Sequence, residues 1–207
     1  SLLLRYSGYT RHIPPMLKAE YHSVSSNKTH FITSPLSGKY QLKNLATTLA
    51  AIEHLQQSGM KIREEHVNAG IRKVLINTGL KGRWQTIAQN PLTIADIGHN
   101  PDGIREIIEQ IALTPHHKLH FVIGVVNDKD VGSMLGKLPV NATYYFCKAS
   151  IPRGLDAGEL AQKAAKFNLQ GKTYNSVKYA LNAARQAAGT GDLVMVGGSA
   201  FVVAEVI

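Results

Sequence analysis

Apolar positions divide the chain into an amino-terminal part with short, mixed stretches and a longer part with a regular rhythm. Over residues 2–32, short apolar stretches alternate with Gly, Pro and Ser, as in small strands joined by loops. Apolar residues then recur at helical spacing over residues 40–56, and a second helix is predicted over residues 63–75. The turn-forming stretch "NTGLKG" follows. We therefore expect two domains, residues 1–78 and 79–207.

Beyond Gly82, strand-like apolar runs and amphipathic helical patterns take turns. The predicted strands span residues 84–88, 92–97, 119–126, 142–147, 171–174 and 193–197. Apolar faces at helical spacing lie at residues 104–111, 131–138 and 177–184. Asp156 and Glu159 predict a capping box for one more helix. This alternation favours an α/β, Rossmann-like domain with a mostly parallel sheet, helices on both faces and ligands at the carboxyl ends of the strands.

The composition is that of a globular protein, and the charge leaves two kinds of partner open. No apolar run approaches the roughly 20 residues of a membrane helix. The net charge of +9 would suit nucleic acid, but the basic residues are scattered and no nucleic-acid-binding motif accompanies them. A small anionic substrate explains the excess equally well. Cys147 is the only cysteine, and its apolar flanks predict a structural thiol. We expect a cytoplasmic protein without nucleic-acid or membrane partners.

The sequence lacks the common catalytic signatures. It contains no G-x-x-x-x-G-K-[ST] phosphate loop, no G-x-G-x-x-G, no H-E-x-x-H and no G-x-S-x-G. It opens with "SLLLRYSGY", which has neither the features of a signal peptide nor an initiator Met. We therefore expect a fragment of a longer protein, with candidate ligand positions but no complete catalytic motif.

The stretch "TIADIGHNPDGI", residues 93–104, joins a predicted strand to a predicted helix. Asn100 can cap the helix and Pro101 can be its first residue, while Asp102 suits the positive end of the helix dipole. This explanation leaves out Asp96 and His99. A carboxylate in an apolar strand is costly to bury unless it is paired or hydrogen-bonded. Both residues are therefore candidates for function, with a structural role as the alternative.

Four other stretches contain polar residues next to predicted strands. Arg83 in "LKGRWQ" could hold a phosphate with its guanidinium fork, or it could be solvated. Asp128 and Asp130 in "VVNDKD" could contact a substrate, but capping of the next helix is favoured. Arg153 in "ASIPRGLDAGEL" could hold an anion, and Ser199 in "MVGGSAF" could bind a carboxylate beside two glycines; a solvated loop and a bare turn are the alternatives.

Taken in order, six stretches resemble the carboxyl-terminal half of folylpolyglutamate synthase, including its bifunctional dihydrofolate synthase form, within the Mur ligase superfamily. They are "SGKYQLKNLATTLAAIEHL", "LKGRWQ", "IADIGHNPDGI", "VVNDKD", "IPRGLDAGELA" and "DLVMVGGSAFVVAEV". The resemblance runs from about Gly38 to the end, and D-x-[AG]-H-N-P after a G-R is its strongest part. Gly98 stands where alanine is common, and "GGS" replaces a more usual T-G-S.

The resemblance implies an ATP-dependent ligase. Such an enzyme activates a folate or pteroate carboxylate as an acyl phosphate, which the amine of L-glutamate attacks. Residues 1–78 would be the remnant of a central ATP-binding domain, and residues 79–207 the glutamate-delivering domain. The phosphate loop, the Mg²⁺ ligands and a modified lysine would lie upstream, so the resemblance predicts a monomeric enzyme and an inactive fragment.

The resemblance also assigns roles to individual residues. The nucleotide would be contacted by Asn44, Arg83 and Asp96, and glutamate by His99, Arg153 and Ser199, of which Arg153 is the looser match. Asp96 and His99 would be the catalytic pair. Two alternatives stay open: a Mur-type ligase that adds an amino acid to a cell-wall precursor, and a non-enzymatic Rossmann-like binding module. The "VVNDKD" stretch favours the folate enzyme.

Overall fold

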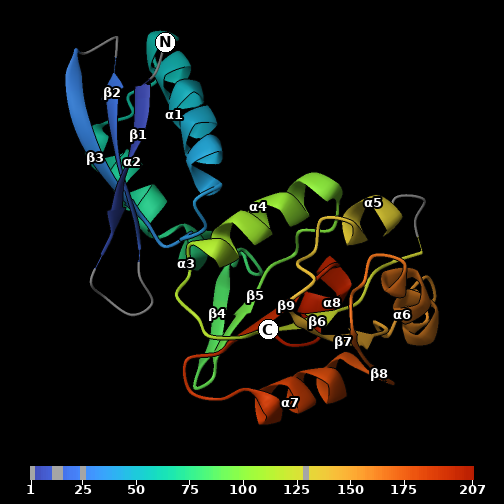
Figure 1. Cartoon of the computed structure of the whole chain (residues 1–207). Helices are drawn as coiled ribbons and strands as arrows, with labels where there is room; N and C mark the ends of the chain where they lie inside the picture. Colours follow the sequence, from blue (N-terminus) through green and yellow to red (C-terminus); the bar gives the residue numbers. More distant parts are fainter. Residues whose placement is uncertain (1–2, 11–15, 24–26, 128–130) are drawn as a thin grey trace. The chain divides into compact units, whose positions relative to one another are not determined.

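A computed structural model describes residues 3–10, 16–23, 27–127 and 131–207 (Figure 1). The chain forms two compact units, Ser1–Lys81 and Gly82–Ile207. Among the described residues, no helix is long and apolar enough to cross a lipid bilayer.

The first unit is an antiparallel sheet with helices on one face. Its elements are β1 (Leu3–Tyr9), β2 (Leu17–Ser23), β3 (Lys28–Ser34), α1 (Gln41–Gln57), α2 (Glu64–Arg72) and α3 (Val74–Thr78). The strand order is β1-β2-β3. Alternate residues of β2, including Leu17 and Tyr21, are buried against Leu49 of α1 and Val67 of α2. The period of two along β2 thus matches a sheet with one covered face.

The helix predicted over residues 63–75 is two helices. Lys73 has φ −102° and ψ 12°, which ends α2 and begins α3. No side chain of α3 is buried, and Ile76 is 83% exposed. Apolar spacing continues through this stretch, but no residue of α3 is buried in the core. The prediction of one helix was therefore wrong.

The second unit contains a six-stranded sheet. Its strands are β4 (Gln85–Gln89), β5 (Leu92–Ala95), β6 (Leu119–Ile123), β7 (Thr143–Cys147), β8 (Gly171–Tyr174) and β9 (Leu193–Gly197). Their order is β4-β5-β9-β6-β7-β8. Only β4 runs antiparallel, paired with β5, and all other pairs are parallel. The predicted, mostly parallel sheet is confirmed.

Helices cover both faces of this sheet, as the sequence predicts (Figure 1). One core contains side chains of α4 (Pro101–Ala112), α5 (Val131–Leu135) and α6 (Ala157–Ala165). The other contains side chains of α7 (Val177–Ala187) and α8 (Ala200–Ala204). Neighbouring strand residues go to opposite cores: Phe121 and Ile123 to the first, Val122 to the second. All residues of β6 are buried, which explains its uninterrupted apolar run.

Two strands end earlier than their apolar runs. β5 ends at Ala95 and β6 at Ile123, although Ile97 packs on one core and Val125 is buried in the other. Hydrophobicity therefore continues into the loops because those loops also fill the core. At α6, Asp156 Oδ1 accepts the amides of Gly158 and Glu159 at 2.8 and 3.1 Å, as in the predicted cap. The Glu159 carboxylate pairs with Lys163 at 3.3 Å, so we find only the first half of the box.

A buried polar network lies where β6 and β9 begin. His120 Nδ1 lies 2.9 Å from the Tyr145 hydroxyl, and His120 Nε2 lies 3.3 Å from Asp192 Oδ2. Asp192 also accepts the amides of Gly189 and Lys118 at 2.8 and 3.1 Å. The Gly189 amide lowers the pKa of Asp192 most; burial opposes this, and His120 and the Lys118 amide lower it further. The network ties the turn before β9 to β6 and β7.

This network predicts a component of acid lability. In the unfolded chain, Asp192 has an ordinary pKa of about 3.9, whereas in the folded protein its pKa is lower. As the pH falls below the pKa of an ordinary aspartate, the unfolded chain takes up a proton that the folded protein does not. The free energy of unfolding therefore falls. The contribution of Asp192 to the free energy of unfolding is complete at pH values above the pKa of the unfolded chain. It is lost as the pH falls through the lower pKa of the folded protein.

Asp192→Asn should therefore lower Tm at neutral pH and flatten its decline between about pH 5 and pH 2. Thermal melts at several pH values in that range measure the effect. Asp102→Asn is the matched control, because the Asp102 side chain is 80% exposed. A decline in the Asp192→Asn variant as steep as in the unaltered chain would contradict the prediction.

Candidate functional site

Asp96 lies directly after β5 and holds two loops. Its side chain is buried, with the residue 2% exposed. Oδ2 accepts the amide of Trp84 at 2.8 Å, and Oδ1 accepts the amide of Gly98 at 2.9 Å. These bonds compensate for the loss of hydration that makes a buried carboxylate costly. We call this arrangement the Asp96 clamp: the Asp96 carboxylate with the Trp84 and Gly98 amides.

Arg83 lies in a turn whose two neighbours have left-handed backbones. Gly82 has φ +69° and Trp84 has φ +47°. A Cβ at Gly82 would lie 2.5 Å from Cγ2 of Ile97, so no other residue fits there without a shift. The Gly82 amide donates to Oε1 of Gln85 at 2.8 Å, and its carbonyl accepts the Ile97 amide at 2.9 Å. The main chain on both sides of Arg83 is therefore fixed.

Trp84 is an unusual residue for a left-handed backbone. That conformation costs a residue with a Cβ roughly 1–2 kcal/mol. Trp84 is 7% exposed and belongs to the first core, and its burial together with the bond from its amide to Asp96 offsets this cost. The turn at Arg83 is thus stabilised by tertiary contacts, not by its own sequence preference.

His99 is exposed at the start of α4. Its Nδ1 lies 3.1 Å from the carbonyl oxygen of Ile97. Since a carbonyl only accepts, Nδ1 carries the proton, and Nε2 of the neutral ring is an acceptor. Asn100 Oδ1 accepts the amide of Gly103 at 2.7 Å, and Pro101 is the first helical residue. The predicted cap of α4 is confirmed.

A second group of polar residues gathers where β7 and β9 end. The Ser199 hydroxyl caps α8 by accepting the Phe201 amide at 3.2 Å, and Ser199 is 2% exposed. The Arg153 guanidinium lies over the Phe201 ring, 5.0 Å from its centre. The loop around Arg153 is held by the Asn127 amide, which donates to the Arg153 carbonyl at 2.9 Å, and by Glu205 Oε1, which accepts the amide of Ser150 at 2.6 Å.

Glycines let four strand ends, those of β5, β6, β7 and β9, approach closely at this edge of the sheet. A Cβ at Gly124 would lie 2.6 Å from the carbonyl oxygen of Cys147. A Cβ at Gly198, which has φ +90°, would lie 2.7 Å from the Gly124 carbonyl oxygen. At Gly197 the nearest atom would be the Asp96 carbonyl oxygen, at 3.2 Å. These three glycines form a floor of main chain, which we call the glycine floor.

Cys147 is a structural residue, and the two aspartates of "VVNDKD" are not described by the structure. Burial, and then Glu205, raises the pKa of the Cys147 thiol to about 12, so the thiolate is not available at neutral pH. The predicted structural thiol is confirmed by its burial. Asp128 and Asp130 lie outside the described residues. Among the residues that are described, no group of three or more His, Cys, Asp or Glu side chains could hold a metal ion.

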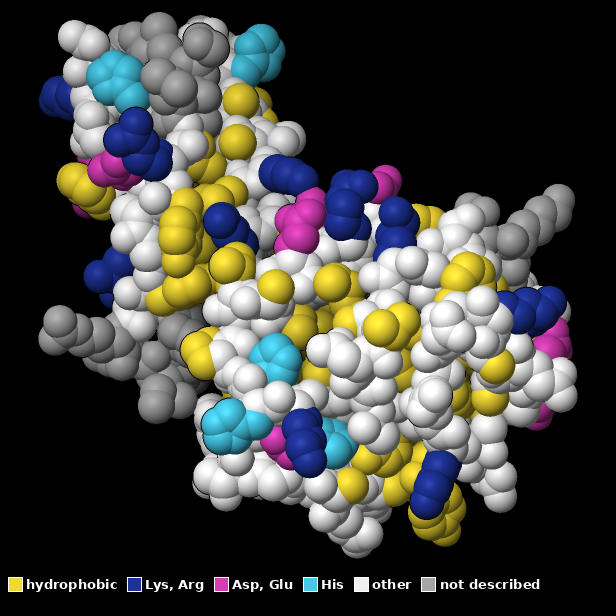
Figure 2. Space-filling model, in the orientation of Figure 1, with side chains coloured by type: hydrophobic (Ala, Val, Ile, Leu, Met, Phe, Trp, Pro, Cys, Tyr) yellow, Lys and Arg dark blue, Asp and Glu magenta, His cyan; other side chains and the backbone are white. Residues whose placement is uncertain are grey.

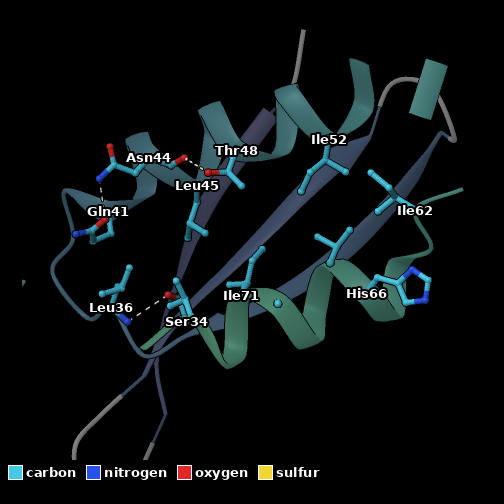
Figure 3. A pocket seen from close by; sticks show the side chains of 13 residues that line it. Ser34, Leu36, Gln41, Asn44, Leu45, Thr48, Ile52, Ile62, His66 and Ile71 are labelled. Carbon is cyan, nitrogen blue, oxygen red and sulfur yellow. Dashed lines mark hydrogen bonds between the residues drawn. The ribbon is translucent and has the colours of Figure 1, made fainter. Parts of the chain in front are cut away.

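Asn44 belongs to the first unit and lines an apolar cavity there (Figure 3). It is exposed on the first turn of α1, where its Nδ2 donates to Oε1 of Gln41 at 2.7 Å. The cavity, of about 330 Å³, lies between α1 and α2, and Leu45, Ile52 and Ile71 are among its apolar walls. Figure 3 shows the two amide side chains together at one end of it.

The structure connects the predicted site residues of the second unit through bonds and contacts with their neighbours in the sequence. The Asp96 clamp joins the neighbours of Arg83 and His99, and the Arg153 guanidinium lies over the ring of Phe201, whose amide donates to the Ser199 hydroxyl. Sequence reasoning missed four supporting residues: Trp84, Gln85, Phe201 and Glu205. No local pattern could have shown them, because each acts through its own backbone conformation or through a contact formed by folding.

Three comparisons with known proteins bear on this site. The family described as "Mur ligase, glutamate ligase domain" matches residues 82–200. The "Probable bifunctional folylpolyglutamate synthase/dihydropteroate synthase" of Haloferax volcanii is 32% identical over 97% of this chain and 23% of its own length. Escherichia coli FolC in complex with DHPP and ADP has a TM-score of 0.77 at 30% identity, over 98% of this chain and 44% of that one.

A Yersinia pestis bifunctional folylpolyglutamate synthase/dihydrofolate synthase, complexed with AMPPNP and a Mn ion, has a TM-score of 0.73 at 27% identity. The match covers 91% of this chain and 42% of that one. The chain thus spans less than half the length of each of these relatives. Because the family match extends over more than half of the chain and coincides with the six-stranded unit, we conclude that the chain belongs to the Mur ligase family, as a carrier of its glutamate ligase domain.

Proposed function

We propose that the chain is part of an ATP-dependent ligase that activates a folate or pteroate carboxylate as an acyl phosphate and joins it to the amine of L-glutamate. The observation that carries the proposal is the Asp96 clamp, which links the turn of Arg83 to the loop of His99 within the domain that matches the family. The names of the relatives support the substrate class. In this proposal residues 1–78, which lie within the unit Ser1–Lys81, are the end of a central ATP-binding domain.

We assign residues of each unit separately to the nucleotide: Arg83, whose neighbour Trp84 is held by Asp96, in the second unit, and Asn44 in the first unit. A guanidinium binds two phosphate oxygens at once and stays charged at every physiological pH. Asn44 presents an amide beside an apolar cavity, a combination that suits a nucleobase. ATP supplies the phosphoryl group that turns the carboxylate into an electrophile, and relatives hold ADP or AMPPNP with Mn. We expect the Mg²⁺ ligands in the rest of the ligase.

The glutamate side consists of His99, Arg153 and Ser199. Arg153 supplies a positive charge for a carboxylate of the substrate. The Ser199 oxygen accepts an amide, which leaves its O–H able to donate to the same carboxylate. The His99 Nε2 atom can accept a proton of the incoming amine, because Nδ1 is the ring nitrogen that faces the Ile97 carbonyl.

Two alternatives make different demands on the chain. A ligase for a cell-wall precursor would use the same edge of the sheet with a different acyl substrate. A nucleic-acid-binding module would need a gathered basic surface. On the face shown in Figure 2, Lys and Arg side chains are scattered among other types. Salt-sensitive binding of DNA or RNA without any response to nucleotide or glutamate would favour the module.

Arg83→Ala in the complete ligase should raise the KM for ATP at least tenfold, because a desolvated charge pair with phosphate is lost. Arg83→Lys should restore only part of this loss, since an ammonium lacks the fork. Steady-state kinetics at saturating glutamate measure both variants. Arg105→Ala is the matched control, an exposed arginine on α4. An unaltered KM for ATP in Arg83→Ala would refute the assignment.

His99→Gln should lower kcat/KM for glutamate by about 100-fold, the scale of a proton-handling group, and leave the KM for ATP nearly unchanged. The measurement is initial rate against glutamate concentration at saturating ATP. His54→Ala, an exposed histidine of α1, serves as the control. Full activity of His99→Gln would refute the proposed role of His99 toward glutamate.

The 207-residue chain alone should show no glutamate-dependent ATP turnover, because its sequence contains no phosphate loop. A coupled ADP-release assay with folate or dihydropteroate and L-glutamate is the test. Turnover above background would contradict this prediction, and with it the proposal that activity needs a phosphate loop from the rest of the ligase.

A further inference from the structure

We propose that Phe201 and Glu205 are positioning residues for glutamate binding: the Phe201 ring orients the guanidinium of Arg153, and the Glu205 carboxylate holds the loop that carries it. Phe201 lies on α8, and Glu205 follows directly after that helix. The inference rests on the proposed function of Arg153 and Ser199. Through the two positioning residues, α8 aligns the charge of Arg153 with the hydroxyl of Ser199.

The first argument is how the main chain around Arg153 is held. The Asn127 amide donates to the Arg153 carbonyl at 2.9 Å, and the Leu155 amide donates to the Val125 carbonyl at 2.9 Å. These bonds fix the main chain near Arg153, but the Arg153 residue itself is exposed. A free arginine side chain loses rotamer freedom when it binds a ligand, so a contact that orients it in advance favours binding.

The second argument is the contact that the Arg153 side chain makes. Its guanidinium lies 5.0 Å from the centre of the Phe201 ring, within the range of cation–π attraction. Phe201 is 38% exposed, whereas the next two residues, Val202 and Val203, are fully buried in the second core. The valines therefore anchor α8 to the sheet, and the Phe201 ring is left for the guanidinium.

The chemistry of a ring suits this task. An aromatic face attracts a cation through its quadrupole and takes up none of the N–H donors of a guanidinium. A carboxylate in the place of the ring would instead occupy the fork that a substrate carboxylate needs. Phe201 thus orients Arg153 while leaving its charge and its N–H donors for the substrate.

The third argument is the second contact between the α8 region and the loop. Glu205 Oε1 accepts the amide of Ser150, which lies between β7 and Arg153, at 2.6 Å. At the start of α8, the Ser199 hydroxyl accepts the Phe201 amide at 3.2 Å. The short segment from Ser199 to Glu205 therefore carries one proposed ligand of the carboxylate and holds the loop of the other at two points.

Kinetics of the complete ligase test the ring. Phe201→Leu should raise the KM for L-glutamate about three- to fivefold, the scale of an exposed cation–π contact, and leave the KM for ATP unchanged. Phe201→Tyr keeps the aromatic face and should restore the KM of the unaltered ligase. Tyr179→Leu is the matched control, since Tyr179 is a 69% exposed aromatic residue of α7. Equal KM values in the two Phe201 variants would overturn the inference, and so would an equal rise in Tyr179→Leu.

A double-variant experiment separates positioning from a direct contact with glutamate. In the Arg153→Ala background, Phe201→Leu should change the KM for glutamate by less than about 1.5-fold, because Phe201 acts through Arg153. The same rise in both backgrounds would show an independent contact and overturn the inference. A KM for glutamate that Arg153→Ala leaves unaltered would refute the proposed function of Arg153 itself, and NMR would then decide on the ring contact alone.

The NMR measurement needs no ligand. In the 207-residue chain, the side-chain protons of Arg153 should show upfield ring-current shifts, because the guanidinium lies over the Phe201 ring. These shifts should disappear in Phe201→Leu and persist in Tyr179→Leu. Arg153 resonances that do not differ between the Phe201→Leu variant and the unaltered chain would overturn the ring contact.

Glu205→Ala tests the second contact. It removes the acceptor of the Ser150 amide, so hydrogen exchange at that amide should become about tenfold faster. Glu205→Gln keeps an oxygen acceptor and should retain slow exchange. Glu109→Ala is the matched control, a glutamate of α4 with a side chain 65% exposed. Unaltered exchange at Ser150 in Glu205→Ala would contradict the role of Glu205.

Discussion

The carboxylate of Asp96, shared between two main-chain amides, is the constraint on which the proposed site depends. Apolar packing builds the sheet and its two covered faces, but it does not determine how the loops leave the strand ends. A buried negative charge must collect donors, and here it collects them from Trp84 and Gly98, on opposite sides of β5 in the sequence. The requirement to satisfy one charge thereby fixes two loops at once.

The same physical solution appears at the other end of the sheet. Asp192 is also buried, also accepts two main-chain amides and also joins segments that are distant in sequence. The difference lies in what surrounds each carboxylate. Asp192 is completed by His120 and Tyr145 within the network, whereas the loops that Asp96 holds carry Arg83 and exposed His99 to the edge. One carboxylate stabilises the fold, and the other arranges groups that face outward.

Much of the fold could be predicted from the sequence because it follows from local periodicity. The order of strands and helices after Gly82, the cap at Asn100 and the buried thiol of Cys147 all depend on residue types within a few positions of one another. The break at Lys73 could not be predicted, because apolar spacing continues through it. The left-handed Trp84 and the ring beneath Arg153 also escaped prediction, since tertiary contacts favour them and local preference does not.

The candidate site divides in the same way. Asp96 stood out because a carboxylate interrupts an apolar run, and that anomaly was visible without a structure. What the carboxylate does became clear only when its two amide partners were known. The assignments to nucleotide and glutamate came from family resemblance, and the geometry adds a physical relation between them that the motifs alone do not contain.

The glycine floor has an implication for how this edge of the sheet can evolve. Gly124 and Gly198 have no space for even one more carbon atom, so mutation cannot place a new functional group at these two positions. Room for a new side chain at this edge is then left at Gly197, where the nearest atom to a Cβ would be 3.2 Å away, and in the surrounding loops. A family built on such a base can alter what it binds by exchanging loops while it keeps the same alignment of strand ends beneath them.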